Sequence, residues 1–173
     1  MEPTSERRFD ANFVMQILLE IAHEQSLEKL LQKLVERVME RPHMVCAQAW
    51  LIEKGDLCAT CLRRPECPDQ SRCLHLAAGR GKSISASGKR QRPFEDLDSR
   101  VPLGVGPIGE AVAAREPKSV THADKQPASL PGLEWRREEG IREYRIAPIR
   151  FKVEPFAGCL SMRRHRPGEG LWL

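Results

Sequence analysis

Four of the six cysteines of this chain lie within one short polar segment, residues 57–74, with the spacing C-x2-C-x5-C-x5-C. Pro, Arg and Asp residues separate them rather than a periodic apolar pattern, which favours a closed thiolate site over a packed core. Thiolates gathered in this way bind zinc or an iron–sulfur cluster, or undergo reversible thiol–disulfide exchange. We name residues 57–74 the cysteine loop. Its four candidate metal ligands are Cys58, Cys61, Cys67 and Cys73.

The residues around the cysteine loop are basic. Nine Lys or Arg residues and three Asp or Glu residues lie between positions 54 and 92. A zinc ion held by four thiolates has a formal charge of about minus two and requires positive surroundings, which this segment supplies. The spacing matches neither the paired C-x2-C of a zinc ribbon nor the C-x2-C-x2-C of a ferredoxin, so zinc and an iron–sulfur cluster both stay open. His75 is a further candidate ligand, although a single His on a strand is usually solvated or hydrogen-bonded.

The other two cysteines and the expected cellular compartment limit the possible roles of the four loop cysteines. Cys46 and Cys159 each sit in an apolar run and are expected to be small buried hydrophobes. The four loop cysteines could instead form two disulfides, which requires an oxidising compartment. The chain begins with a charged segment that lacks a secretory signal, and no stretch approaches the ~18 apolar residues of a membrane helix. We therefore expect a cytoplasmic protein without membrane contact, which favours a metal-bound or redox-active site over permanent disulfides.

The composition is that of a folded globular domain. Of the 173 residues, 40% are hydrophobic and 30% are charged, which predicts one hydrophobic core rather than disorder. The net charge of +4 is modest, and the basic residues are not interleaved with aromatic ones. We therefore expect no nucleic-acid binding by this segment.

Two predicted strands, residues 43–53 and 73–78, flank the cysteine loop, which is then the long connection of a hairpin. An ordered loop of that length needs something to hold it, and a metal would do so.

Upstream, Ser26 divides a helical apolar pattern into two helices, of which the second begins at Leu27. The first is a candidate arm for a homodimer, although such a stripe also suits plain core packing. The remaining segments predict a polar loop with one edge strand at 79–100, a helix at 108–115, a strand at 118–122, a loop with a one-turn helix around Leu133 and Trp135 at 123–140, and a terminal hairpin of strands at 141–151 and 155–162.

A glycine-rich segment ahead of the predicted helix 108–115 could be mistaken for a dinucleotide fingerprint. Gly104, Gly106 and Gly109 spell G-x-G-x-x-G, and Asp124 lies twenty residues after the first glycine. The fingerprint needs a buried parallel strand before it, whereas the preceding residues are polar, and Pro107 lacks a backbone N–H inside the turn. We therefore expect the glycines to form a tight turn into the helix.

Three stretches, in this order and spacing, make the chain similar to a GAF domain, the small-molecule sensor module of phosphodiesterases, phytochromes and histidine kinases. They are SLEKLLQKLVERVMER, VPLGVGPIGEAVAAREPKSV and EGIREYRIAPIRFKVEPFAGCLSM. The resemblance implies an α+β fold, with an antiparallel sheet of five or six strands, helices packed on one face and a ligand pocket on the other. The chain looks like the N-terminal domain of sigma-54-dependent activators or signalling kinases. The cysteine loop departs from the general family pattern, so no ligand residues can be carried over.

The resemblance also divides the chain. Residues 1–25 would form an N-terminal helical arm and residues 26–163 the GAF-like sensory domain that contains the cysteine loop. Residues 164–173 would be a tail cut before a C-terminal helix that leads to an output domain.

No Ser, Cys or His arrangement in the sequence makes a convincing catalytic group, so we expect that the chain is not an enzyme. The favoured hypothesis is a sensory or regulatory domain whose cysteine loop binds a metal or cluster, or responds to redox state, and controls a transcriptional or signalling output on the same or another chain. One alternative is a module that binds a small molecule or cyclic nucleotide and has a purely structural cysteine loop. A second is a thiol–disulfide reductase that acts through Cys58 and Cys61.

Overall fold

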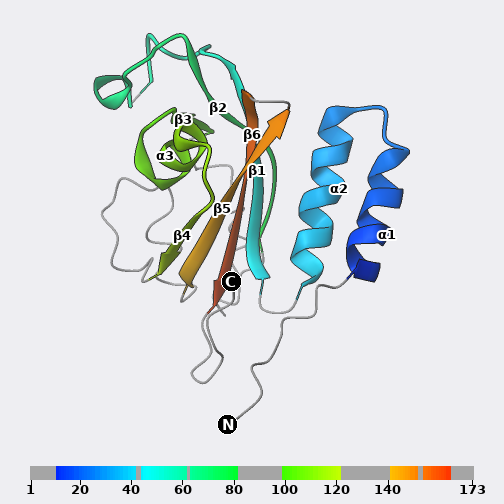
Figure 1. Ribbon diagram of the computed structural model, residues 1–173. Coiled ribbons are helices and arrows are strands. Elements are labelled where there is room, and N and C mark those ends of the chain that lie inside the picture. The colour runs from blue at the N-terminus through cyan, green and yellow to red at the C-terminus, as the bar shows by residue number, and fades with distance from the viewer. Residues whose placement is uncertain are drawn as a thin grey trace, which may run out of the picture.

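A six-stranded antiparallel sheet forms the centre of the structure, in the order β3-β2-β1-β6-β5-β4 (Figure 1). The computed structural model describes residues 11–41, 44–61, 63–81, 99–121, 141–151 and 154–164, without the side chains of residues 142 and 150–164. The predicted α+β class and its antiparallel sheet of five or six strands are confirmed.

The helix α2 (Leu27–Glu40) packs on one face of the sheet, and α1 (Ala11–Ala22) lies antiparallel to it on the side away from the sheet (Figure 1). The predicted break at Ser26 is confirmed, since its carbonyl accepts the first helical hydrogen bond from Leu30 N. The buried side of α2 packs on small side chains of the sheet, which let the helix approach closely. This cluster contains Leu31, Val35 and Met39 from α2 with Ala47, Ala49 and Ala78 from the sheet.

Charged and aromatic contacts hold α1 against α2. Arg37 of α2 pairs with Glu20 of α1, and Lys33 pairs with Glu24. The guanidinium of Arg41 lies 4.7 Å from the centre of the Phe13 ring. The opposite side of α1 is apolar and exposed, at Met15, Leu18 and Leu19.

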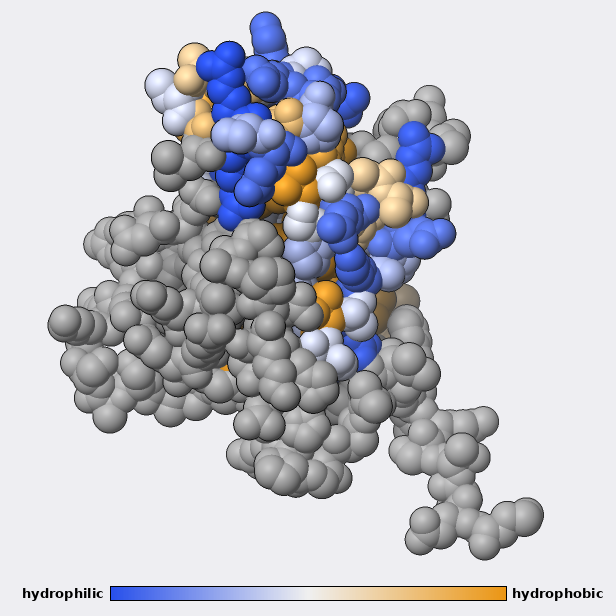
Figure 2. All heavy atoms as spheres, turned by 90° about the vertical axis from the view of Figure 1, so that its left-hand side faces the viewer, coloured by the Kyte–Doolittle hydropathy of each residue, from blue (hydrophilic) through white to orange (hydrophobic). Residues whose placement is uncertain are grey.

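The predicted strands on either side of the cysteine loop are confirmed. They are β1 (Met44–Lys54) and β2 (Arg72–Gly81), which pair antiparallel. Lys54 and Arg72 form the last pair before the loop. The end of the molecule that carries this loop is at the top in Figures 1 and 2, and its surface is predominantly hydrophilic.

The other half of the sheet contains β4 (Lys118–Thr121), β5 (Ile141–Phe151) and β6 (Glu154–Arg164). The predicted terminal hairpin is confirmed, and β6 inserts next to β1 at the centre of the sheet. Arg164, predicted to begin the tail, ends β6 instead.

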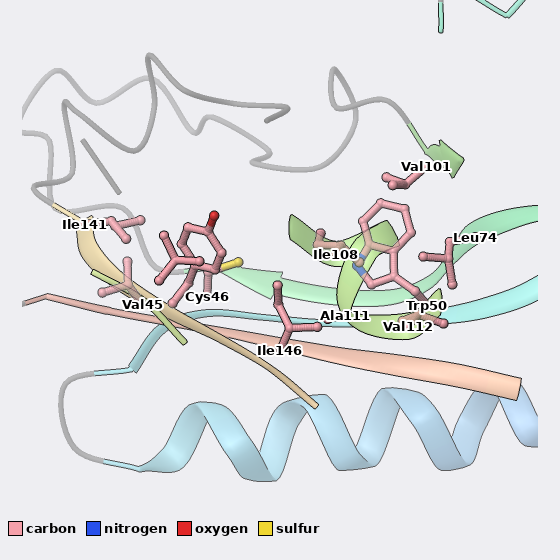
Figure 3. Close-up of a cluster of buried hydrophobic side chains, with 12 residues drawn as sticks. Val45, Cys46, Trp50, Leu74, Val101, Ile108, Ala111, Val112, Ile141 and Ile146 are labelled. Atoms are coloured by element: carbon pink, nitrogen blue, oxygen red, sulfur yellow. The ribbon is translucent and has the colours of Figure 1, made fainter. Parts of the chain in front are cut away.

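The second face of the sheet holds the larger core, which α3 (Gly106–Ala114) covers and to which the edge strand β3 (Arg100–Pro102) contributes Val101. The helix begins two residues before the predicted start. In Figure 3 the Trp50 indole lies beside Leu74, Val101 and Ile108. Cys46 belongs to this core and is fully buried, as predicted. The expectation of helices on one face therefore describes α1 and α2, whereas α3 covers the opposite face.

The glycines before α3 build a turn rather than a phosphate cradle. Gly104 and Gly106 have φ angles of +79° and +64°, which suit glycine. A β-carbon at Gly109 would collide with the carbonyl oxygen of Pro102, so this glycine lets α3 lie directly on β3. β3 is a short antiparallel edge strand, not the buried parallel strand of a dinucleotide fold.

Several predictions lie outside the described residues. These are residues 82–98 of the polar loop predicted at 79–100, Asp124, and the one-turn helix around Leu133 and Trp135. Residues 79–81, predicted to belong to that loop, form the end of β2 instead. The side chain of Cys159 and residues 1–10 and 165–173 also lie outside them. Among the described helices, none has the length and apolar character needed to cross a membrane.

Candidate metal site in the cysteine loop

A series of tight turns folds the cysteine loop at one end of the sheet, beside β3 (Figure 1). Gly55 N donates to Ser71 O at 2.8 Å and closes the base of the loop. Farther out, Thr60 N donates to Leu57 O and Arg64 N donates to Cys61 O, and a one-turn 3-10 helix covers Arg64–Glu66. These turns give the segment a defined path without a periodic apolar pattern.

This path brings all four predicted ligands to one cavity. The cavity has a volume of about 20 Å³, which is on the scale of a single water molecule or ion. Cys73 is buried, whereas the other three thiols are partly exposed. All are free cysteines. The four cysteines that line the cavity are Cys58, Cys61, Cys67 and Cys73.

Two of the thiols are held by backbone carbonyls of the returning arm of the loop. Cys58 Sγ donates to Gln70 O at 2.9 Å, and Cys67 Sγ donates to Asp69 O at 3.1 Å. Metal binding would exchange these contacts for bonds to the ion, since a ligating thiolate has no proton to donate. A β-carbon at Gly55 would overlap Cys58 Sγ, so glycine is needed where this sulfur approaches the backbone.

Burial raises the pKa of the Cys73 thiol to about 11, from an ordinary value of 9.0. Arg100 opposes this shift, whereas Asp56, Cys58 and Cys61 add to it. Cys73 is therefore a protonated thiol at neutral pH, and a metal that bound its sulfur would displace that proton.

The charges that line the cavity fit a thiolate-bound dication. Three arginines, Arg64, Arg72 and Arg100, line the cavity together with one acidic residue, Asp56. Their combined charge of plus two balances a divalent ion with four thiolates, which carries about minus two. The structure thus concentrates the basic character predicted from the sequence around the cavity itself.

Asp56 and Arg100 connect the loop to β3. Arg100 Nε and Nη2 donate to the two carboxylate oxygens of Asp56 at 2.9 and 2.5 Å. This pairing with Arg100 holds the pKa of Asp56 well below its usual range. Sequence analysis did not identify either residue, because they are 44 positions apart.

A tighter group of potential ligands lies at the base of the cavity. Donor atoms of Asp56, Cys73 and His75 all lie within 4.8 Å of one another. In the part of the chain that the structure describes, no three of the loop sulfurs form a group this compact. His75, the further candidate of the sequence analysis, is therefore adjacent to the cavity, and Asp56 is a neighbour that the sequence did not reveal.

The chain is similar to known proteins at the level of structure. No family model and no curated protein matches the chain. The GAF domain of Acinetobacter phosphoenolpyruvate-protein phosphotransferase superposes with a TM-score of 0.59 at 19% identity, covering 92% of this chain and 80% of that one. The nlh2 GAF domain of A. aeolicus, in an inactive state, gives 0.60 at 12% identity, with 90% and 79% covered.

Enzymes share the same fold. The free methionine-R-sulfoxide reductase of Neisseria meningitidis, solved with its substrate, gives a TM-score of 0.61 at 16% identity, with 91% and 75% covered. The expectation that the chain is not an enzyme is therefore not supported by the fold, which occurs in sensors and reductases alike. Because the identities are below 25%, the likeness concerns the fold. This chain has the fold of a GAF domain.

Proposed function

We propose that this chain is a sensory domain of the GAF fold whose cysteine loop binds one zinc ion through four thiolates. The single observation that carries the proposal is the convergence of Cys58, Cys61, Cys67 and Cys73 on one cavity. A cavity of about 20 Å³ has room for one ion, whereas an iron–sulfur cluster contains several metal and sulfide atoms. Size therefore favours zinc over a cluster.

The position of the cavity suggests how metal binding there would affect β3 and α3. Its wall includes Arg100 and Pro102 of β3, and β3 leads through the Gly104 turn into α3. An ion that draws the four sulfurs together would tighten the loop against β3. Removal of the ion, or oxidation of its thiolates, would loosen β3 and α3 while the α2 side of the sheet stays packed. An output domain would respond to this change in the packing of β3 and α3.

Oxidation supplies a balanced chemical route between the two states. Cys58 and Cys61 can form one S–S bond by giving up two electrons in total. Hydrogen peroxide, as the oxidant, accepts these electrons with two protons and leaves as two water molecules. With two ligands consumed, the site no longer has a full set of thiolates for zinc. A dithiol reverses the reaction.

Elemental analysis of protein purified without oxygen from zinc-supplemented medium tests the metal proposal. We expect stoichiometric zinc and no visible absorption band, and we expect the double variant Cys58→Ser, Cys61→Ser to lose one equivalent. Cys46→Ala is the matched control, because Cys46 is a buried core thiol near the end of β1 that is farther from the loop, and it should retain the metal. If the double variant contains as much zinc as the wild type, the four-cysteine site is disproved.

Hydrogen exchange tests the sensory part of the proposal. Removal of zinc by a chelator should speed the exchange of amides in β3 and α3 and leave those in α2 unchanged. Equal exchange in all three elements with and without metal would mean that the loop is a structural staple. The proposed module would then be one that binds a small molecule or cyclic nucleotide elsewhere on the domain.

A second candidate function is a thiol reductase, favoured by the partial exposure of Cys58 and Cys61 and by a fold shared with free methionine-R-sulfoxide reductases. Two thiols would pass two electrons and two protons to a sulfoxide, releasing water and a sulfide and leaving a disulfide. The small volume of the cavity argues against an amino-acid substrate. Turnover of free methionine sulfoxide with a dithiol donor, abolished in the double variant, would establish this activity in place of the zinc site.

We also propose that the chain forms a homodimer through α1. Met15, Leu18 and Leu19 are more than half exposed and are spaced three and four residues apart, so they share one side of the helix. Light scattering of the wild type and of Leu18→Glu tests this proposal. A dimer that dissociates in the variant supports it, and a monomeric wild type rules it out.

A further inference from the structure

We propose a second metal subsite beside the four-cysteine site, formed by His75, Asp56 and Cys73, with Glu53 orienting the imidazole. It rests on the proposed function only in that Cys73 belongs to both sites. Cys73 would bridge the two ions, as thiolates can when metal sites are adjacent. The ligand class is a divalent ion of borderline softness such as zinc, because the donors are one nitrogen, one oxygen and one sulfur.

The backbone brings these donors together. Cys73 and His75 are alternate residues of β2, so their side chains leave the strand on the same face. Glu53 is paired with Cys73 in the β1–β2 register, and Asp56 follows β1 by two residues. The three donor atoms thus meet where the loop begins and ends, within 4.8 Å of one another.

The two nitrogens of His75 have the environments of a metal-bound imidazole. Nδ1 lies 3.1 Å from a carboxylate oxygen of Glu53, which can only accept, so Nδ1 is the nitrogen that carries the proton. The lone pair of the neutral ring is then on Nε2. Carboxylates that fix a histidine in this way are the usual outer partners of histidine ligands, because they set the tautomer and the ring orientation.

Nε2 of His75 lacks a hydrogen-bond partner among the described residues, although the side chain is buried with 8% of the residue exposed. It lies 3.6 Å from Asp56 Oδ1, which is too long for a hydrogen bond. Two ligands of one tetrahedral ion, each about 2.0 to 2.1 Å from the metal, are separated by a similar distance. An ion between them would satisfy Nε2 and explain why a buried acceptor has been left open.

Asp56 can serve this ion without releasing Arg100. Each carboxylate oxygen has two lone-pair directions, and Arg100 occupies one on each. With three protein ligands, the subsite would keep a fourth position for water or for an incoming group. It would therefore exchange its ion more readily than the closed four-thiolate site.

Metal titration under anaerobic conditions tests the subsite, with Co²⁺ as the probe because its absorption reports bound thiolates. The wild type should bind two equivalents in two phases. His75→Phe keeps the size of the side chain but removes the nitrogen, so it should abolish the weaker phase and leave the stronger one. His23→Phe is the matched control, since His23 lies at the end of α1 outside the cavity lining, and it should bind two equivalents.

The double variant Cys58→Ser, Cys61→Ser separates this inference from the proposed function. It should retain one equivalent that His75→Phe then removes. If it instead retains all of the metal and His75→Phe retains none, the four-cysteine site is wrong and the subsite stands. If His75→Phe binds as the wild type does, or if the wild type binds a single equivalent that both variants lose, a separate second subsite is excluded.

A positioning variant keeps the test decisive if His75→Phe fails to fold. Glu53→Gln leaves every ligand in place and lies at an exposed position, so the fold should persist. It should weaken the second phase by about 10-fold to 100-fold, which is the usual effect of losing an outer-shell carboxylate. An unchanged second phase in folded Glu53→Gln would overturn the assigned role of Glu53 and, with it, the tautomer argument for His75.

Discussion

Asp56 and Arg100 form a two-point ion pair that joins the start of the cysteine loop to β3, with contacts of 2.9 and 2.5 Å. Both residues line the thiolate cavity. The pair therefore links the proposed metal site to the strand that leads into α3.

The Asp56–Arg100 pair should give the protein an acid-sensitive component of stability. Because the folded pKa of Asp56 is depressed, the contribution is complete above the ordinary aspartate pKa of about 4 and is lost as the pH falls through the folded value. Asp56→Asn should be less stable than the wild type at pH 7, with the difference shrinking under acidic conditions. Urea unfolding of both metal-free proteins across this range measures it. A difference that is constant with pH would mean that the pair does not contribute to stability.

Cys73 should make the metal-free protein sensitive to alkali. Its folded pKa is raised to about 11 from 9.0, so its contribution is complete below pH 9 and is lost as the pH rises through about 11. The melting temperature of the metal-free wild type should fall more steeply over this interval than that of Cys73→Ala. Zinc should flatten the wild-type profile, because a bound Cys73 is already a thiolate. Identical slopes for the two metal-free proteins would contradict the assigned burial effect.

Gly55→Ala should disturb the cysteine loop specifically. The added β-carbon would overlap Cys58 Sγ and lie 2.9 Å from Gln70 O, a backbone atom that cannot easily move. We expect a loss of about 1–3 kcal/mol in unfolding free energy, as for other overpacked sites, together with weaker metal binding. Ala59→Ser, an exposed change in the same loop, is the control and should leave both unchanged. Wild-type metal affinity in Gly55→Ala would show that Cys58 has another position available.

Trp50 should be the largest single contributor to the core beneath α3. It is 2% exposed, and Trp50→Ala should cost about 3–5 kcal/mol in urea unfolding. Trp50→Phe should cost less, because it also removes an indole N–H that has no hydrogen-bond partner among the described residues. Leu27→Ala, at a position that is 47% exposed and lies outside α1, is the control and should change stability by less than about 0.5 kcal/mol. Equal losses in the two Trp50 variants would contradict the account of the indole.

Local patterns were sufficient for most of the secondary structure. The helix that begins at Leu27 and the strands around the cysteine loop follow from apolar periodicity, which depends on neighbours in sequence. The pattern could not place α3, because a short helix with many small apolar residues does not indicate which face of a sheet it covers. That choice depends on the fit of Gly109 against Pro102.

The candidate site, too, was predictable from the sequence only in part. The spacing of the four cysteines and the basic residues around them predicted a thiolate site, because ligands within one short loop are constrained by the chain itself. That the sulfurs share one small cavity, and that Arg100 reaches it from β3, could be established only by the folded structure.

The amino-acid sequence alone determined which thiols could act together and which segments would become helices and strands, since both depend on residues close together in the chain. Tertiary structure decided that Asp56 meets Arg100 and that His75 faces Asp56 beside Cys73. These contacts depend on the register of the antiparallel strands and on the return of the chain to the edge of the sheet. A shift of one residue in that register would place a ligand side chain on the opposite face of the sheet.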